Sequence, residues 1–249
     1  MSEAAVALKS DETLIQQWLA LALTPGLGAN KSRRLVEFFG SVQAVFRATL
    51  TELEAAGLRA VSAQSLATGQ SAELAQEELG RAMAAGAVVV VMDDPAYPSQ
   101  LKQIYDPPLV LYVRGNVAAL SQPGIALVGT RHPTPYGLGM AERLACDLAA
   151  RGLVIFSGLA RGVDTAGHRG AIAGKGKTVA VLGTGVDVIY PKEIRGWLIR
   201  LSPWVEQSFP SFPLALLRRR KTSRSAIALL AESRLVSWSS RRRNIVAHG

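Results

Sequence analysis

The 249-residue chain has one cysteine, three histidines and few aromatic residues, which make up 6% of it. The single cysteine, Cys146, excludes an internal disulfide and a cysteine-rich zinc site, and it fits a reducing cytosol. No uninterrupted apolar run approaches the roughly 18 residues that a membrane span requires. The first residues lack the basic and apolar segments of a secretion signal. We therefore expect a cytoplasmic protein with no membrane contact.

Motifs of common enzyme classes are also missing. The chain has no G-x-S-x-G nucleophile elbow, no P-loop lysine and no acidic cluster suited to a metal-dependent nuclease. The dinucleotide fingerprint G-x-G-x-x-G does not follow the expected strand ending at Val128, and no acidic residue ends the next strand to hold a ribose. These absences favour a binding surface over an enzyme, with no catalytic residue, no metal and no cofactor.

The net charge of +9 is unevenly distributed along the chain. Residues up to Glu193 include 17 basic and 17 acidic side chains, whereas the 56 residues after it hold 11 basic and 2 acidic ones. A basic protein is usually suspected of binding nucleic acid. Here the excess belongs to the C-terminal segment, so it is weak evidence about the region that carries the motifs.

Hydrophobic periodicity divides the chain. Apolar residues at helical spacing predict a helical N-terminal domain over residues 1–86, in which Ser41, Thr51 and Ser62 are candidate N-caps. From residue 87, short apolar strands alternate with helices, which predicts a Rossmann-like α/β domain with a parallel sheet over residues 87–193. The expected strands are 88–92, 109–113, 125–128, 153–156 and 179–182, and the expected helices are 137–151 and 164–173.

A glycine-containing turn joins the first two predicted helices. Gly26 and Gly28 lie in this turn, and Lys31 opens the second helix. This is the layout of a helix-hairpin-helix, whose turn can bring backbone amides against a DNA phosphate. The alternative is a tight turn that only packs two helices together.

Three strand ends in the α/β domain run into small residues. Because the carboxyl ends of parallel strands meet at one edge of a sheet, we expect these turns to converge on one rim. Glycine permits close backbone approach, free amides at a helix start hold phosphate, and arginine adds charge-assisted hydrogen bonds. We predict phosphate binding by Gly129, Thr130, Arg131, Ser157, Gly158, Arg161, Gly162 and Gly183. The alternative is that the glycines only make turns while the arginines pair with carboxylates.

Two further pairs of residues are open to a functional interpretation. Asp164 and His168 are four residues apart and would share one face of a helix, but a metal site needs a third ligand. We interpret Asp164 as a helix cap and His168 as a local hydrogen-bond partner. Tyr97 and Tyr136 could stack on bases, although single aromatic residues beside glycine and proline more often pack in turns.

In their order and spacing, these motifs resemble the DNA-processing protein A (DprA/Smf) family. The resemblance runs from about residue 12 to Glu193 and rests on Val128–Arg131, on Ser157–Asp164 with His168, and on Gly176–Gly185 through Tyr190-Pro191. It implies a cytoplasmic bacterial protein that is not an enzyme, binds single-stranded DNA, protects incoming DNA in natural transformation and loads the RecA recombinase. It also implies a homodimer, and it assigns the predicted phosphate-binding residues to the DNA surface.

Two other functions stay open at this point. One is a nucleotide-binding hydrolase or transferase on the same Rossmann-like scaffold, with the rim holding a single nucleotide. The other is a DNA-architectural protein that acts through the helical hairpin and the basic C-terminal segment.

After Glu193 the sequence departs from the family pattern. Trp197, Trp204 and two arginine runs are scattered among serine and leucine without strand and helix alternation. Our hypothesis is that residues 194–249 are a frameshifted reading of a longer gene, and the alternative is a divergent basic tail that binds nucleic acid electrostatically. We expect an incomplete sheet with an open edge, which would weaken folding, dimerisation and DNA affinity.

Overall fold

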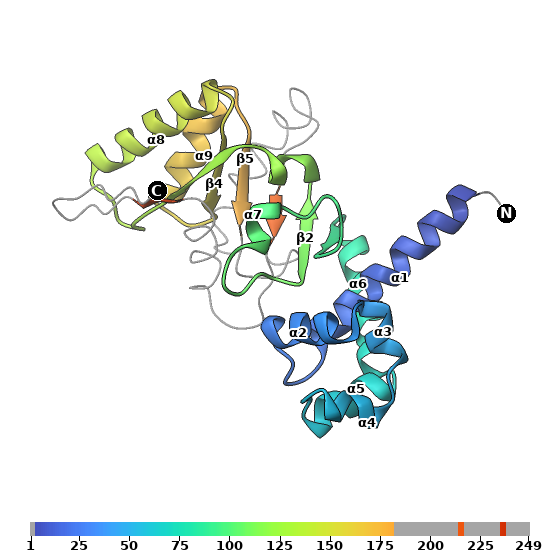
Figure 1. The fold of residues 1–249 in the computed structure, drawn as a ribbon. Coiled ribbons are helices and arrows are strands. Elements are labelled where there is room, and N and C mark those ends of the chain that lie inside the picture. Colours follow the sequence, from blue (N-terminus) through green and yellow to red (C-terminus); the bar gives the residue numbers. More distant parts are fainter. Residues whose placement is uncertain (1–2, 182–213, 217–234, 238–249) are drawn as a thin grey trace. The chain divides into compact units, whose positions relative to one another are not determined.

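The computed structural model of the protein describes residues 3–181, 214–216 and 235–237. The chain forms two compact units, which Figure 1 colours along the sequence. One unit consists of residues through Pro95 together with Tyr105–Leu111, and the other consists of Ala96–Ile104 and residues from Tyr112 onward.

The first unit is helical, as its periodicity predicts. Helix α1 packs against α6, and the shorter helices pack on one another in neighbouring pairs. Trp18, Leu19 and Leu21 of α1 are fully buried, and the Trp18 indole Nε1 donates to Oδ2 of Asp93 over 3.0 Å. The elements are α1 (Glu3–Leu23), α2 (Ala29–Phe39), α3 (Val42–Arg47), α4 (Leu50–Ala55), α5 (Ala60–Ala67), α6 (Gln70–Ala84) and β1 (Val88–Val91).

The helix starts in this unit differ in part from the prediction. Ser41 caps α3 as predicted, because its side chain accepts the Ala44 amide. Helix α4 is capped by Thr49 in a capping box with Glu52, so the prediction of Thr51 is wrong. Ser62 is not a cap, because it lies inside α5, whose N-cap residue is Arg59. Its hydroxyl donates to the Pro25 carbonyl over 2.7 Å.

The second unit contains a parallel sheet with strand order β5-β4-β3-β7. Its strands are β3 (Gly124–Val128), β4 (Val154–Gly158), β5 (Thr178–Val181) and β7 (Leu235–Ser237), and its two long helices are α8 (Pro135–Ala150) and α9 (Val163–Ala173). The order of strands and helices expected for β3 to β5 is confirmed, with ends shifted by at most two residues.

Helices α8 and α9 lie side by side and pack on the sheet (Figure 1). Small residues permit this close packing: Ala141, Ala145 and Ala149 form a buried stripe on α8. A Cβ atom on Gly170 of α9 would collide with the backbone carbonyl of Glu142 on α8. The helices are therefore held at a fixed separation that a larger residue at position 170 would increase.

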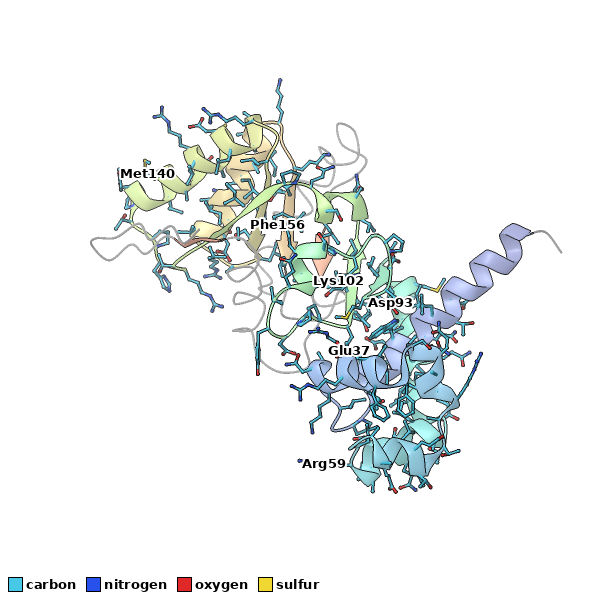
Figure 2. All side chains as sticks on the ribbon, in the orientation of Figure 1. Glu37, Arg59, Asp93, Lys102, Met140 and Phe156 are labelled. Carbon is cyan, nitrogen blue, oxygen red and sulfur yellow. The ribbon has the colours of Figure 1, made fainter. Side chains whose placement is uncertain are left out.

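Alternate residues of β4 face opposite sides of the sheet. Ile155 joins the buried core beneath α8 and α9, whereas Phe156, labelled in Figure 2, packs over Gly124 of the neighbouring strand β3. A Cβ atom on Gly124 would lie 2.5 Å from the Phe156 ring, so a side chain there would displace the ring. Residues of both faces therefore fix how β3 and β4 pair.

Two short strands come from the segment after Glu193. Strand β7 pairs with β3 in parallel, with Val128 opposite Ser237. Strand β6 (Leu214–Leu216) pairs antiparallel with β2 (Val110–Arg114), with Tyr112 opposite Leu216. The segment thus contributes two strands although its sequence shows no strand and helix alternation, and β7 covers one edge of β3. The remaining elements are α7 (Ser99–Lys102) and the 3₁₀ helix η1 (Val117–Ser121).

Candidate functional site

The loops that follow β3 and β4, residues 129–134 and 159–162, form one continuous surface that we call the rim. The Val163 amide at the start of α9 donates to the Thr130 carbonyl over 3.3 Å. A Cβ atom on Gly162 would overlap this carbonyl and would lie 3.0 Å from Cα of Arg131. The two loops are therefore in direct contact. The third predicted turn, with Gly183, lies outside the described residues.

Two glycines of the rim are required by its geometry. Gly162 has φ +90° and ψ −128°, a conformation that residues with a side chain rarely adopt. Gly129 lies against the side chain of Val163, which a Cβ atom at position 129 would approach to 2.8 Å. Glycine at these positions therefore lets the loop after β3 rest on the first turn of α9.

Asp164 in the first turn of α9 is buried, with 4% of its surface exposed, and it accepts the backbone amides of Gly129 and Ala160. Burial raises the pKa of its carboxyl to about 6. The hydrogen bonds from these two amides and the positive charge of Arg131 oppose that rise. The N-cap of α9 is Gly162, so Asp164 is not the helix cap that the sequence suggested. Its side chain joins the two loops instead.

His168 also bonds at long range rather than locally. Its Nε2 lies 2.8 Å from the Gly158 carbonyl and its Nδ1 lies 2.7 Å from the Thr178 hydroxyl, so the buried ring connects α9 to β4 and β5. A carbonyl only accepts, so Nε2 carries a hydrogen. Burial lowers the pKa of His168 to about 4, which favours the neutral ring.

Several predicted phosphate contacts have partners inside the protein. Ser157 is 0% exposed, and its hydroxyl donates to the Leu127 carbonyl over 2.5 Å. Gly158 is buried, and a Cβ atom on it would lie 2.5 Å from Oδ2 of Asp164. Because the amide of Gly129 also bonds to Asp164, the expectation of free backbone amides along the rim is corrected for this residue.

Exposed side chains remain on the rim. Arg131 and Arg161 are both exposed, one from each loop, and Arg131 makes no ion pair with any residue that the structure describes. The Thr130 oxygen accepts the His132 amide over 3.2 Å, which leaves its hydroxyl hydrogen to donate elsewhere. Tyr136, in the first turn of α8, is 70% exposed. The rim therefore presents guanidinium and hydroxyl groups to solvent, and the aromatic ring of Tyr136 lies beside it at the start of α8.

The glycine turn between α1 and α2 has the geometry of a tight hairpin. Gly26 has φ +74°, and Thr24, buried behind it, donates to the Ala20 carbonyl. Gly28 caps α2 with its backbone and has no side-chain cap. Gly28 and Lys31 are exposed. The start of α2 is therefore accessible from solvent.

Other predicted features are placed as follows. Tyr97 is only 3% exposed and lies beneath the Lys102 ammonium, 5.7 Å from its ring centre, so it does not present a face for base stacking. Among the described residues, no group of three or more His, Cys, Asp or Glu side chains could hold a metal ion. Within the same part of the chain, no helix is long and apolar enough to cross a bilayer.

The strand order of the second unit defines its class. In β5-β4-β3-β7 the chain first builds the sheet in one direction from β3 and later adds β7 on the opposite side. This is the doubly wound, Rossmann-like arrangement, in which ligands bind beyond the carboxyl ends of the strands beside the point of reversal. The rim begins at the carboxyl end of β3, next to that point.

Comparison with known proteins assigns the family. The sequence model of the DNA recombination-mediator protein A family matches residues 88–203. The chain is 46% identical over 102 residues to DNA processing protein DprA of Streptococcus pneumoniae, and 33% identical over 190 residues to protein Smf of a Synechocystis species. The X-ray structure of the Streptococcus protein matches with a TM-score of 0.66 at 25% identity, covering 88% of this chain and 73% of that one. The chain belongs to the DprA/Smf family, which confirms the resemblance.

The aligned regions are partial. They cover 41% of this chain and 36% of the Streptococcus relative, and 72% of this chain and 46% of the Synechocystis relative. The sequence alignments thus span less than half the length of these two proteins. The family match ends at residue 203. This is ten residues beyond Glu193, after which the sequence departs from the family pattern.

Proposed function

We propose that this chain binds single-stranded DNA along the rim as a non-enzymatic recombination mediator in the cytoplasm. The observation that carries the proposal is the pair of exposed arginines, Arg131 and Arg161, on two loops in direct contact. Guanidinium groups form strong charge-assisted bonds with phosphate. Membership of a DNA-processing family supports the same class of ligand.

The predicted site residues take different parts in this proposal. The side chains of Thr130, Arg131 and Arg161 and the backbone of Gly162 form the proposed contact surface for phosphates. Ser157 and Gly158 are buried and shape the loops without touching the ligand. Gly129 is exposed, and because its amide bonds to Asp164 only the rest of its backbone would contact the ligand. Gly183 stays a predicted contact on the third loop.

A second DNA contact is proposed at the hairpin of the helical unit. Gly26, Gly28 and Lys31 would bind a backbone phosphate at the start of α2, where Gly28 leaves open space and Lys31 adds positive charge. Lys31→Ala should then weaken binding to dT oligonucleotides and reduce the slope of log K against log salt by about 0.7, the value for one lost contact with a single strand. Unchanged affinity in Lys31→Ala would count against this second contact.

Fluorescence anisotropy with dT oligonucleotides of graded length tests the rim. We expect affinity to rise with length and to fall with salt. Arg131→Ala should weaken binding at least about tenfold, the effect of losing one charge-assisted hydrogen bond. It should also reduce the slope of log K against log salt by about 0.7, the value for one lost contact with a single strand.

Arg151→Ala is the matched control. Arg151 is an exposed arginine of the same unit, located after α8 and about 24 Å along the helix axis from the rim. The substitution removes one positive charge, as Arg131→Ala does, but leaves the residues of the rim unchanged. If Arg131→Ala and Arg151→Ala reduce affinity equally, the rim is not the binding surface and only net charge matters.

The finer parts of the proposal are the protection of incoming DNA in natural transformation and the loading of RecA. Both are tested with RecA filament assembly on oligonucleotides coated by single-strand binding protein, with and without the chain. The implied homodimer is tested by size-exclusion chromatography. Sequencing past codon 193 in the other two reading frames tests the frameshift hypothesis, because a frameshift predicts that the family pattern resumes there.

A second candidate, a nucleotide-binding hydrolase or transferase, is favoured by one observation: the rim begins at the sheet position where Rossmann-like proteins hold nucleotides. Saturation by a mononucleotide, with no gain from longer oligonucleotides, would select it. The third candidate, a DNA-architectural protein, predicts that neutralising the arginines of the C-terminal segment abolishes binding while Arg131→Ala leaves it intact.

A further inference from the structure

The carboxyl of Asp164 lies directly beneath the rim and connects its two loops. It accepts one amide from the loop after β3, at Gly129, and one from the loop after β4, at Ala160. The side chain is 4% exposed, and there is no room for a Cβ atom between its Oδ2 and Gly158. A buried group that bonds to both loops fixes their separation, and with it the spacing of the phosphate contacts above.

The same carboxyl is a negative charge close to a surface proposed to bind phosphate. Arg131 is the cation that favours its ionised form. A bound phosphate would pair with Arg131 and add negative charge of its own, and both effects favour the protonated carboxyl. Its pKa of about 6 in the free protein means that a modest further rise brings the group into the neutral pH range.

We propose that Asp164 is a proton-linked positioning residue: it holds the two loops of the rim together, and the binding of DNA phosphates draws a proton onto its carboxyl. The proton-linked part rests on the proposed function, and the positioning part does not. The charged and titratable groups near it are Arg131 and His132 on the loop after β3, Arg161 on the loop after β4, and His168 one turn later on α9. Of these, His132 is an exposed imidazole on a loop of the rim, so it needs its own control.

Proton uptake is measured by calorimetric titration of dT oligonucleotide into the full chain in two buffers of different ionisation enthalpy. We expect the wild type to take up a fraction of a proton at about pH 6.5, and its affinity to fall about tenfold with rising pH for each unit by which binding raises the pKa. Asp164→Asn, which keeps a carbonyl acceptor, should lose most of this uptake. His132→Gln should retain it.

Uptake that is equal in Asp164→Asn and the wild type, or that disappears in His132→Gln, would overturn the proton-linked part. If the wild type binds no dT oligonucleotide at any pH, the proposed function fails instead. Amide hydrogen exchange then decides the positioning part without DNA. Slow exchange at Gly129 and Ala160 in the wild type, with fast exchange at both in Asp164→Ala, supports it, whereas equal rates in these two proteins refute it.

Discussion

Replacing Gly162 with alanine puts a methyl group into the contact between the two loops of the rim. The residue has φ +90° and ψ −128°, and its Cβ atom would overlap the Thr130 carbonyl and lie 3.0 Å from two backbone atoms of Arg131. Backbone atoms cannot rotate away as the end of a flexible side chain does. The loop after β3 must therefore move, or position 162 must change conformation and shift the start of α9.

The expected loss of stability follows from these two effects. A residue forced into a sparsely populated conformation costs about 1–3 kcal/mol, and displacing packed backbone brings the total for Gly162→Ala to about 3 kcal/mol or more. A domain is usually stable by about 5–15 kcal/mol, so the variant should still fold. The displaced loop contains Thr130 and Arg131. The affinity of Gly162→Ala for dT oligonucleotides should therefore fall about as far as that of Arg131→Ala.

Two other glycines provide matched controls. Gly139→Ala in α8 meets nothing within 4 Å, so it should stabilise the protein by up to about 1 kcal/mol through helix propensity. Gly170→Ala pushes against the Glu142 backbone between α8 and α9, so it should lose stability without altering the rim. Urea unfolding and fluorescence anisotropy on all three variants measure stability and binding separately.

The outcome for Gly162→Ala can contradict the reasoning in two ways. Stability equal to that of Gly139→Ala would mean that the backbone at position 162 does not have the conformation described here. A loss of stability like that of Gly170→Ala, with unchanged DNA affinity, would mean that the contact between the loops is real but that DNA binds elsewhere.

Three further predictions concern stability. Burial raises the pKa of Asp164 from 3.8 to about 6 and lowers that of His168 from 6.5 to about 4, so ionising the first costs stability as pH rises and protonating the second costs stability as pH falls. At about 3 kcal/mol each, the two effects nearly cancel between about pH 4 and pH 6 in the wild type. Asp164→Asn should instead lose about 3 kcal/mol as the pH falls, and an equal pH dependence of both proteins in urea titrations would contradict this. Ser157→Ala should cost about 1–3 kcal/mol by removing the bond to the Leu127 carbonyl and the side-chain hydrogen bond to Asp164. Its DNA affinity should be unchanged, whereas reduced affinity with unchanged amide exchange at Gly129 and Ala160 would revive a direct phosphate contact. Thr49→Ala should lower the melting temperature by removing a capping box of about 1 kcal/mol, and no change would show that this helix start is supported by packing alone.

The periodicity of the sequence predicts the regular elements well because each strand or helix depends on its own residues. It fails where two local solutions are equally good. Both Thr49-x-x-Glu52 and Thr51-x-x-Glu54 fit the capping box that begins α4, and only the first is used. Leu53 is buried against the rest of the helical unit, so tertiary packing fixes the register of the helix.

The site is predictable to a different extent. The sequence correctly predicts that the loops after β3 and β4 meet, because parallel strands impose this. It does not predict which groups of the two loops form hydrogen bonds with each other. Asp164 accepts a hydrogen bond from the amide of Gly129, which is far from it in sequence. His168 forms hydrogen bonds with Gly158 and Thr178, which lie on two different strands. Spacing along a single helix carries no information about such partners.

The internal bonds of the rim narrow the kind of ligand that it suits. A turn that binds a single phosphate does so with several backbone amides that point to one place. Here the amides of Gly129 and Ala160 donate to Asp164 instead, and the Val163 amide donates to the Thr130 carbonyl. The exposed guanidinium groups of Arg131 and Arg161 lie on the two loops that those bonds hold in place. Such donors contact successive phosphates of a strand better than the clustered phosphates of a nucleotide. We therefore expect the rim to prefer a polyanion that binds with an affinity dependent on charge, length and salt. Tight binding of a mononucleotide would show that the backbone amides exchange hydrogen-bond partners on binding.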